Sequence, residues 1–145
     1  MKGQKQKIVD TNIGDCFRAC MASLLELPID VLPNDHSPAW FGNWLKFLDQ
    51  FGLGLCSSAN PDGPIWATEP WIATVKSKNF EGGTHAILMH HGGIVLFDPS
   101  TKKRYRTGES LLGKKIVSGA YHLTVTDAGA LYHLKEYQKQ LSKKV

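Results

Sequence analysis

Apolar residues change their spacing part-way along this chain, and that change limits the folds open to it. Between residues 14 and 52 they recur every three or four positions, the period of a helix with one buried face. From residue 71 the apolar runs are short and rich in β-branched and aromatic residues, as in strands. Helices that precede a block of strands predict an α+β fold with an antiparallel sheet.

Two helices are expected first, over residues 14–27, closed by Pro28, and over residues 37–52, with Ser37 as N-cap and Gly52 at the end. The later elements are strands at 53–57, 71–75, 84–90, 93–98 and 120–126 and a helix at 128–143. That last helix is amphipathic, with an apolar stripe of Leu131, Leu134, Tyr137 and Leu141. We expect it to lie on the domain.

The length of 145 residues fits one domain that spans residues 1–145. With 42% hydrophobic and 21% charged residues, the composition is globular and not that of a disordered chain. The longest apolar runs, such as residues 86–89 and 94–97, are too short to cross a bilayer, and no apolar stretch follows the lysine-rich start as in a signal peptide. We expect a cytoplasmic protein without a membrane partner.

The net charge of +4 is concentrated at the two ends of the chain. The first seven residues and the last eleven each carry +3, so residues 8–134 carry −2. Basic ends on a mildly acidic body do not resemble the basic groove that binds nucleic acids. Nucleic acid is therefore not an expected partner.

The three cysteines, Cys16, Cys20 and Cys56, are too few and too unevenly spaced for a disulfide framework or a zinc site. Cys16 lies in the first turn of the first expected helix, where unpaired N–H groups and the helix dipole favour a thiolate. Cys16 is thus either a nucleophile or a small core residue, whereas Cys20 and Cys56 are expected in the core.

His85 and Asp98 lie on two expected strands that are joined by a tight turn. A loop of His91 and Gly92 would place the two residues directly opposite each other, and a loop of Gly92 and Gly93 would make them diagonal neighbours on one face. A three-residue loop would separate them. A base beside an orienting acid is the arrangement that activates a nucleophile; the alternatives are a structural histidine and an aspartate that starts a turn.

Three segments around these residues carry the pattern of a known family: residues 14–28, 85–87 and 97–99, which read GDCFRACMASLLELP, HAI and FDP. They resemble the papain-like cysteine peptidase superfamily, and within it small stand-alone bacteriophage proteins similar to double-glycine leader peptidases. The resemblance covers most of residues 8–100. It implies a papain-like fold, with the nucleophile-bearing helix packed on an antiparallel sheet, a Cys16–His85–Asp98 triad and, for a phage protein, the host cytoplasm.

The family pattern places a glutamine a few residues before the cysteine, where its amide stabilises the oxyanion. This sequence has Asp10 at that point, a poor donor when ionised, while Asn12 offers a side-chain amide and the N–H of Cys16 remains. Loss of one oxyanion donor costs about 10²–10³ in rate. Trp40 and Trp44, one helical turn apart, are candidates for the walls of a substrate cleft, with core packing as the alternative.

We therefore expect a cysteine-dependent hydrolase or acyl transferase that acts on an amide-type bond of a protein or peptide. Cys16 attacks, His85 takes up and returns the proton, and Asp98 orients the imidazole. This chemistry requires no metal or organic cofactor. The alternative is a catalytically weak or silent binding or inhibitor module that captures a host protein. The sequence favours no particular oligomeric state.

Overall fold

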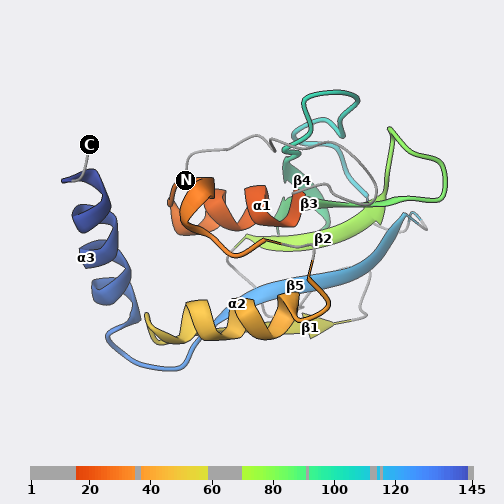
Figure 1. Ribbon diagram of the computed structural model, residues 1–145. Coiled ribbons are helices and arrows are strands. Elements are labelled where there is room, and N and C mark those ends of the chain that lie inside the picture. The colour runs from red at the N-terminus through yellow and green to blue at the C-terminus, as the bar shows by residue number, and fades with distance from the viewer. Residues whose placement is uncertain are drawn as a thin grey trace.

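The computed structural model describes residues 16–34, 37–58, 70–90, 92–111, 114 and 116–143. Within these residues the chain has an α+β fold, with three α-helices and a five-stranded antiparallel sheet (Figure 1). The elements are α1 (Cys16–Leu25), the 3₁₀-helix η1 (Ile29–Val31), α2 (Trp40–Asp49), β1 (Leu53–Ser58), β2 (Trp71–Lys76), β3 (Thr84–His90), β4 (Ile94–Phe97), β5 (Val117–Val125) and α3 (Ala130–Ser142). The strand order is β1-β5-β2-β3-β4. The α+β class predicted from the apolar spacing is confirmed.

The second helix begins later than the sequence predicts. Ala39 donates its N–H to the Ser37 hydroxyl at 3.1 Å and Trp40 donates to the Ser37 carbonyl at 3.0 Å, so Ser37 forms a turn ahead of the helix instead of capping it. The predicted cap of the first helix at Gly14 or Asp15 lies outside the described residues.

The sheet carries a core on each of its faces. On one face α1 packs on β3 and α2 packs on β1, and Ile72 and Leu88 are buried beneath the helices. On the other face, alternate residues of the same strands, such as Trp71 and Ile87, are buried with Tyr105 of the segment that follows β4. Burial on both faces explains why β2 and β3 read as nearly continuous apolar runs.

Helix α1 is buried on almost all sides, with small residues where it approaches its neighbours. The ring of Phe17 meets the rings of Trp40, Trp44 and Tyr121 edge-on, with centroids 5.3, 5.7 and 5.3 Å away. These contacts join α1 to α2 and to β5. The start of α1 is therefore held in a fixed position over the sheet.

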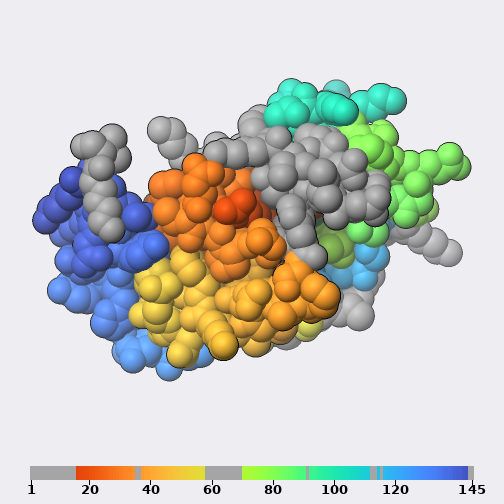
Figure 2. Space-filling view, viewed as in Figure 1, coloured from red at the N-terminus to blue at the C-terminus, as the bar shows by residue number. Residues whose placement is uncertain are grey.

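Helix α3 lies against α1 and α2 at one end of the molecule (Figure 2, blue). The Gln138 side chain donates to the Leu25 carbonyl at 2.7 Å, which satisfies one of the unpaired carbonyls at the end of α1. Leu131 was predicted to share the buried stripe but is 66% exposed. At 100° per residue it lies about 90° from the centre of the face formed by the other three stripe residues.

Gly52 connects the end of α2 to the sheet in a backbone conformation with φ of +76°. Its carbonyl accepts hydrogen bonds from the N–H groups of Thr126 and Asp127 at 2.8 and 3.1 Å. A Cβ at position 52 would lie 2.5 Å from the Cβ of Asp127, so only glycine fits there. Among the described residues, no helix has the length and apolar composition needed to cross a membrane.

Candidate active site

The hairpin of β3 and β4 has a different loop from either of the two that the sequence suggested. His90 pairs with Ile94, so three residues and not two form the loop. The two glycines in it have φ of +85° and +77°, which glycine adopts without strain. A regular ladder built on this loop would place His85 and Asp98 on opposite faces of the hairpin.

A β-bulge reverses that outcome. Met89 pairs with Val95, whereas Leu88 pairs with Phe97, so Leu96 is an extra residue without a partner in the ladder. The extra residue changes the register by one and returns the histidine and the aspartate to a common face. The two-residue loop was therefore wrong, but the pairing it was meant to explain is present.

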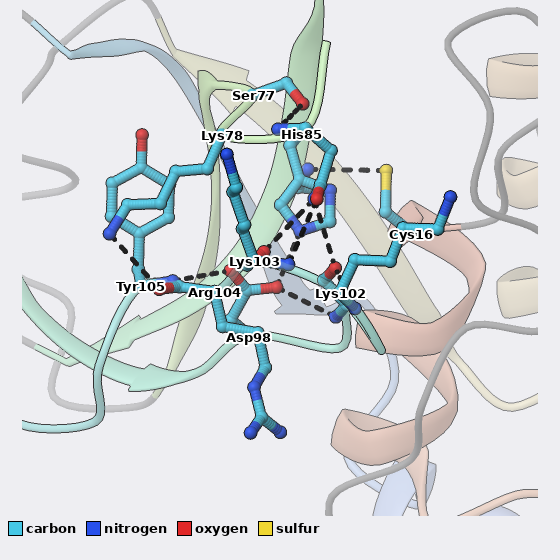
Figure 3. A network of polar contacts seen from close by, with 12 residues as sticks. Cys16, Ser77, Lys78, His85, Asp98, Lys102, Lys103, Arg104 and Tyr105 are labelled. Carbon is cyan, nitrogen blue, oxygen red and sulfur yellow. Dashed lines mark hydrogen bonds and ion pairs between the residues drawn. The ribbon is translucent and has the colours of Figure 1, made fainter.

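The imidazole and the carboxylate form a short, buried contact. His85 Nε2 lies 2.6 Å from Asp98 Oδ1, and the two residues are 9% and 3% exposed (Figure 3). The N–H of Ser100 also donates to Oδ1 at 2.9 Å, and the N–H of Tyr105 donates to Oδ2 at 2.9 Å. Three partners thus hold the carboxylate in one orientation.

These contacts determine the charge of the pair. Burial alone would lower the pKa of His85, but hydrogen bonds to Asp98 and Cys16 and their charges outweigh burial and raise that pKa to about 9. Burial alone would raise the pKa of Asp98, but His85 and the N–H groups of Ser100 and Tyr105 hold it below its usual 3.8. At neutral pH the pair is an imidazolium and a carboxylate.

Cys16 reaches this pair from the first described turn of α1. The N–H of Ala86, which follows His85 in β3, donates to Cys16 Sγ at 3.4 Å, and Cys20 Sγ donates to the Ala86 carbonyl at 3.4 Å. The two thiols therefore bind the N–H and the carbonyl of the same residue of β3, Ala86. Figure 3 shows the Cys16 sulfur directed toward His85. Since Asp98 occupies Nε2, Nδ1 is the ring nitrogen left for the sulfur.

Other predicted site residues have different positions. Trp44 is fully buried between α1, α2 and the sheet, which corrects its assignment to a cleft wall. Trp40 is partly buried and packs on the edge of the same core. Cys56 was expected in the core but is exposed, because β1 alternates and it is the neighbouring Leu55 that points inward.

The two candidate oxyanion residues, Asp10 and Asn12, lie outside the described residues. The backbone donors that hold the acid, at Ser100 and Tyr105, were not found from the sequence, because an N–H group is common to almost every residue and leaves no signal there. In the described part of the chain no cluster of three or more His, Cys, Asp and Glu side chains is arranged to hold a metal ion.

Comparisons with protein-family models, with curated proteins and with solved structures gave no match for this chain. The site brings together a thiol in the first described turn of α1, an imidazolium and a buried carboxylate, which are the groups that nucleophilic catalysis by cysteine uses.

Proposed function

We propose that the protein is a cysteine-dependent hydrolase or acyl transferase that acts on an amide-type bond of a protein or peptide. The observation that carries the proposal is the position of the His85 imidazole, whose Nε2 lies 2.6 Å from Asp98 Oδ1 while the Cys16 sulfur is directed toward the ring (Figure 3). A histidine that served only the fold would not need a buried acid on one nitrogen and a thiol directed toward its ring.

In this mechanism the Cys16 sulfur attacks the carbonyl carbon of the substrate, and the C–N bond breaks as His85 donates its proton to the leaving amine. The product of this step is a thioester on Cys16. Neutral His85 then removes a proton from water, or from an acceptor nucleophile, which attacks the thioester and frees the sulfur. Asp98 keeps Nε2–H in place throughout, so that Nδ1 exchanges protons with the reacting groups.

A relationship to the papain-like cysteine peptidases remains part of this proposal. It is supported by α1, which bears Cys16 at its start and packs on the strand that bears His85. The acid follows on the next strand of the antiparallel sheet. These relative positions are the ones that the resemblance of the three sequence segments implies.

Labelling with a peptide electrophile, such as a peptidyl vinyl sulfone, tests the proposal. The chain should carry Cys56→Ser, because Cys56 is an exposed thiol that would react without assistance. We expect stoichiometric labelling at Cys16 at neutral pH, and its loss in His85→Ala. His90→Ala is the matched control, since His90 is an exposed residue of the same strand, and it should label normally.

Two results would overturn the proposal that the protein is an enzyme. One is the absence of labelling at Cys16 in a folded chain, and the other is equal labelling in His85→Ala and the parent chain. Either result would favour the binding or inhibitor module, in which the fold presents a surface and the thiol has no role.

A further inference from the structure

The segment that follows the buried aspartate is strongly basic. Residues 101–107 read TKKRYRT and hold four cations in seven positions. The net charge of residues 8–134 is nevertheless −2, because acidic residues elsewhere in this interval outnumber the cations. Figures 1 and 2 show the segment in teal, projecting at the surface beyond β4.

Internal hydrogen bonds give this segment a defined shape. The Asn79 side chain accepts from the Lys103 N–H at 3.0 Å and donates to the Lys103 carbonyl at 3.1 Å. The buried Tyr105 donates its hydroxyl to the Lys76 carbonyl, and the Thr107 hydroxyl donates to a carbonyl of β4 at 3.2 Å. The basic side chains are thus presented by a backbone that is anchored to β2, to β4 and to the loop before β3.

Three of the four basic residues, Lys102, Arg104 and Arg106, line a cavity of about 510 Å³. Its other lining residues are Phe97, Asp98, Tyr105 and Thr107. Lys78, whose ammonium lies 4.3 Å from the centre of the Tyr105 ring, adds a further positive charge nearby.

The cations of this cavity have no carboxylate partner within the described residues. The Asp98 carboxylate is held by His85 and by backbone N–H groups. The Glu109 carboxylate accepts from the backbone N–H of Arg106 and lies 4.0 Å from Lys114. The Asp98 carboxylate in the cavity wall is paired with His85, so the three positive side chains have no carboxylate of their own and favour a bound anion.

We propose that this cavity binds an oxyanion, namely a carboxylate or phosphate group, through Lys102, Arg104 and Arg106. The planar guanidinium groups match the two oxygens of either group. A single cavity suits one such group better than a polynucleotide, which needs cations spread along a groove. The bound group would lie behind Asp98 as seen from His85, so the inference does not depend on a reactive Cys16.

The test is an NMR titration of the ¹⁵N-labelled chain at constant ionic strength, with chloride replaced by inorganic phosphate in one arm and by a hexaglutamate peptide in the other. Saturable shifts of the amides of residues 104–107 in either arm would support the site, and the arm that saturates identifies phosphate or a peptide carboxylate as the ligand. We expect Arg104→Gln to weaken binding about tenfold. Cys16→Ser should leave binding unchanged, which separates this test from that of the catalytic proposal.

Lys139→Gln is the matched control, because Lys139 is an exposed cation on α3, away from the cavity. Its binding should equal that of the parent chain. The proposal is wrong if neither ligand gives saturable shifts in a chain with a folded spectrum. It is also wrong if Lys139→Gln weakens binding as much as Arg104→Gln, since that result would show general attraction to a basic protein.

Discussion

Raising the pH from about 6 to about 9.5 is expected to destabilise the fold through one group, the imidazole of His85. The pKa of His85 is about 9 in the folded chain against 6.5 when free, so the folded chain binds this proton more tightly than the unfolded chain. One pKa unit corresponds to about 1.4 kcal/mol, so the protonated pair contributes on the order of 3 kcal/mol to the free energy of unfolding. That contribution is complete below pH 6.5 and is lost as the pH rises through 9.

Urea unfolding followed by tryptophan fluorescence measures this loss, because Trp44 and Trp71 are fully buried. His85→Gln is the reference, since it removes the proton site and should be nearly independent of pH over this range. Asp98 loses its contribution only as the pH falls below its usual 3.8, and Tyr105 titrates above its usual 10. Equal losses of stability in the parent chain and in His85→Gln between the two pH values would contradict this prediction.

Three further substitutions, one of them paired with a control, test other parts of the structure. Asp98→Asn should slow the labelling of Cys16 about tenfold or more, because a neutral amide stabilises the imidazolium less well than a carboxylate; equal rate constants in a kinetic labelling assay would contradict this. Gly52→Ala should cost about 2 kcal/mol or more in urea unfolding, whereas Gly42→Ala, in an open helical position, should add about 0.5–1 kcal/mol. Gln138→Ala should cost about 1 kcal/mol by removing the hydrogen bond to the end of α1, and an unchanged midpoint would refute that role.

The order of helices and strands could be predicted because it depends on local spacing. Apolar residues at helical and strand periods, with glycine and proline at the ends, located the α-helices and strands of the described residues to within about three residues, but did not predict the 3₁₀-helix η1. The register of the β3–β4 hairpin could not be predicted in this way. Leu96 is an apolar residue inside an apolar strand, and nothing in its identity marks it as the extra residue of a bulge.

Burial was harder to predict than periodicity. Trp40 and Trp44 share helical spacing, yet Trp44 is fully covered while Trp40 lies at the edge of the core. Phe17 of α1 contacts both rings and Tyr121 of β5 contacts Trp40, so the surroundings of both rings depend on elements distant in the sequence. A local pattern identifies the apolar face of a helix, but the packing of distant elements decides which of its residues meet solvent.

The three residues of the candidate triad could be predicted from the sequence, but the groups that hold them in place could not. The sequence placed Cys16 at a helix start and brought His85 and Asp98 to neighbouring strands. The backbone donors to the carboxylate come from a segment whose path depends on tertiary contacts, such as the burial of Tyr105. The cationic cavity was missed for a related reason, since charge was summed over a long interval and not along that segment.

The most direct test of the account compares two thiols of the same chain. Iodoacetamide alkylation at pH 7, resolved by peptide mass spectrometry, gives separate rate constants for partly buried Cys16 and exposed Cys56. If His85 and Asp98 activate Cys16, it should react about tenfold faster than Cys56 despite being less exposed, and His85→Ala should remove that advantage. A Cys16 that reacts more slowly than Cys56, with no change in His85→Ala, would contradict the account.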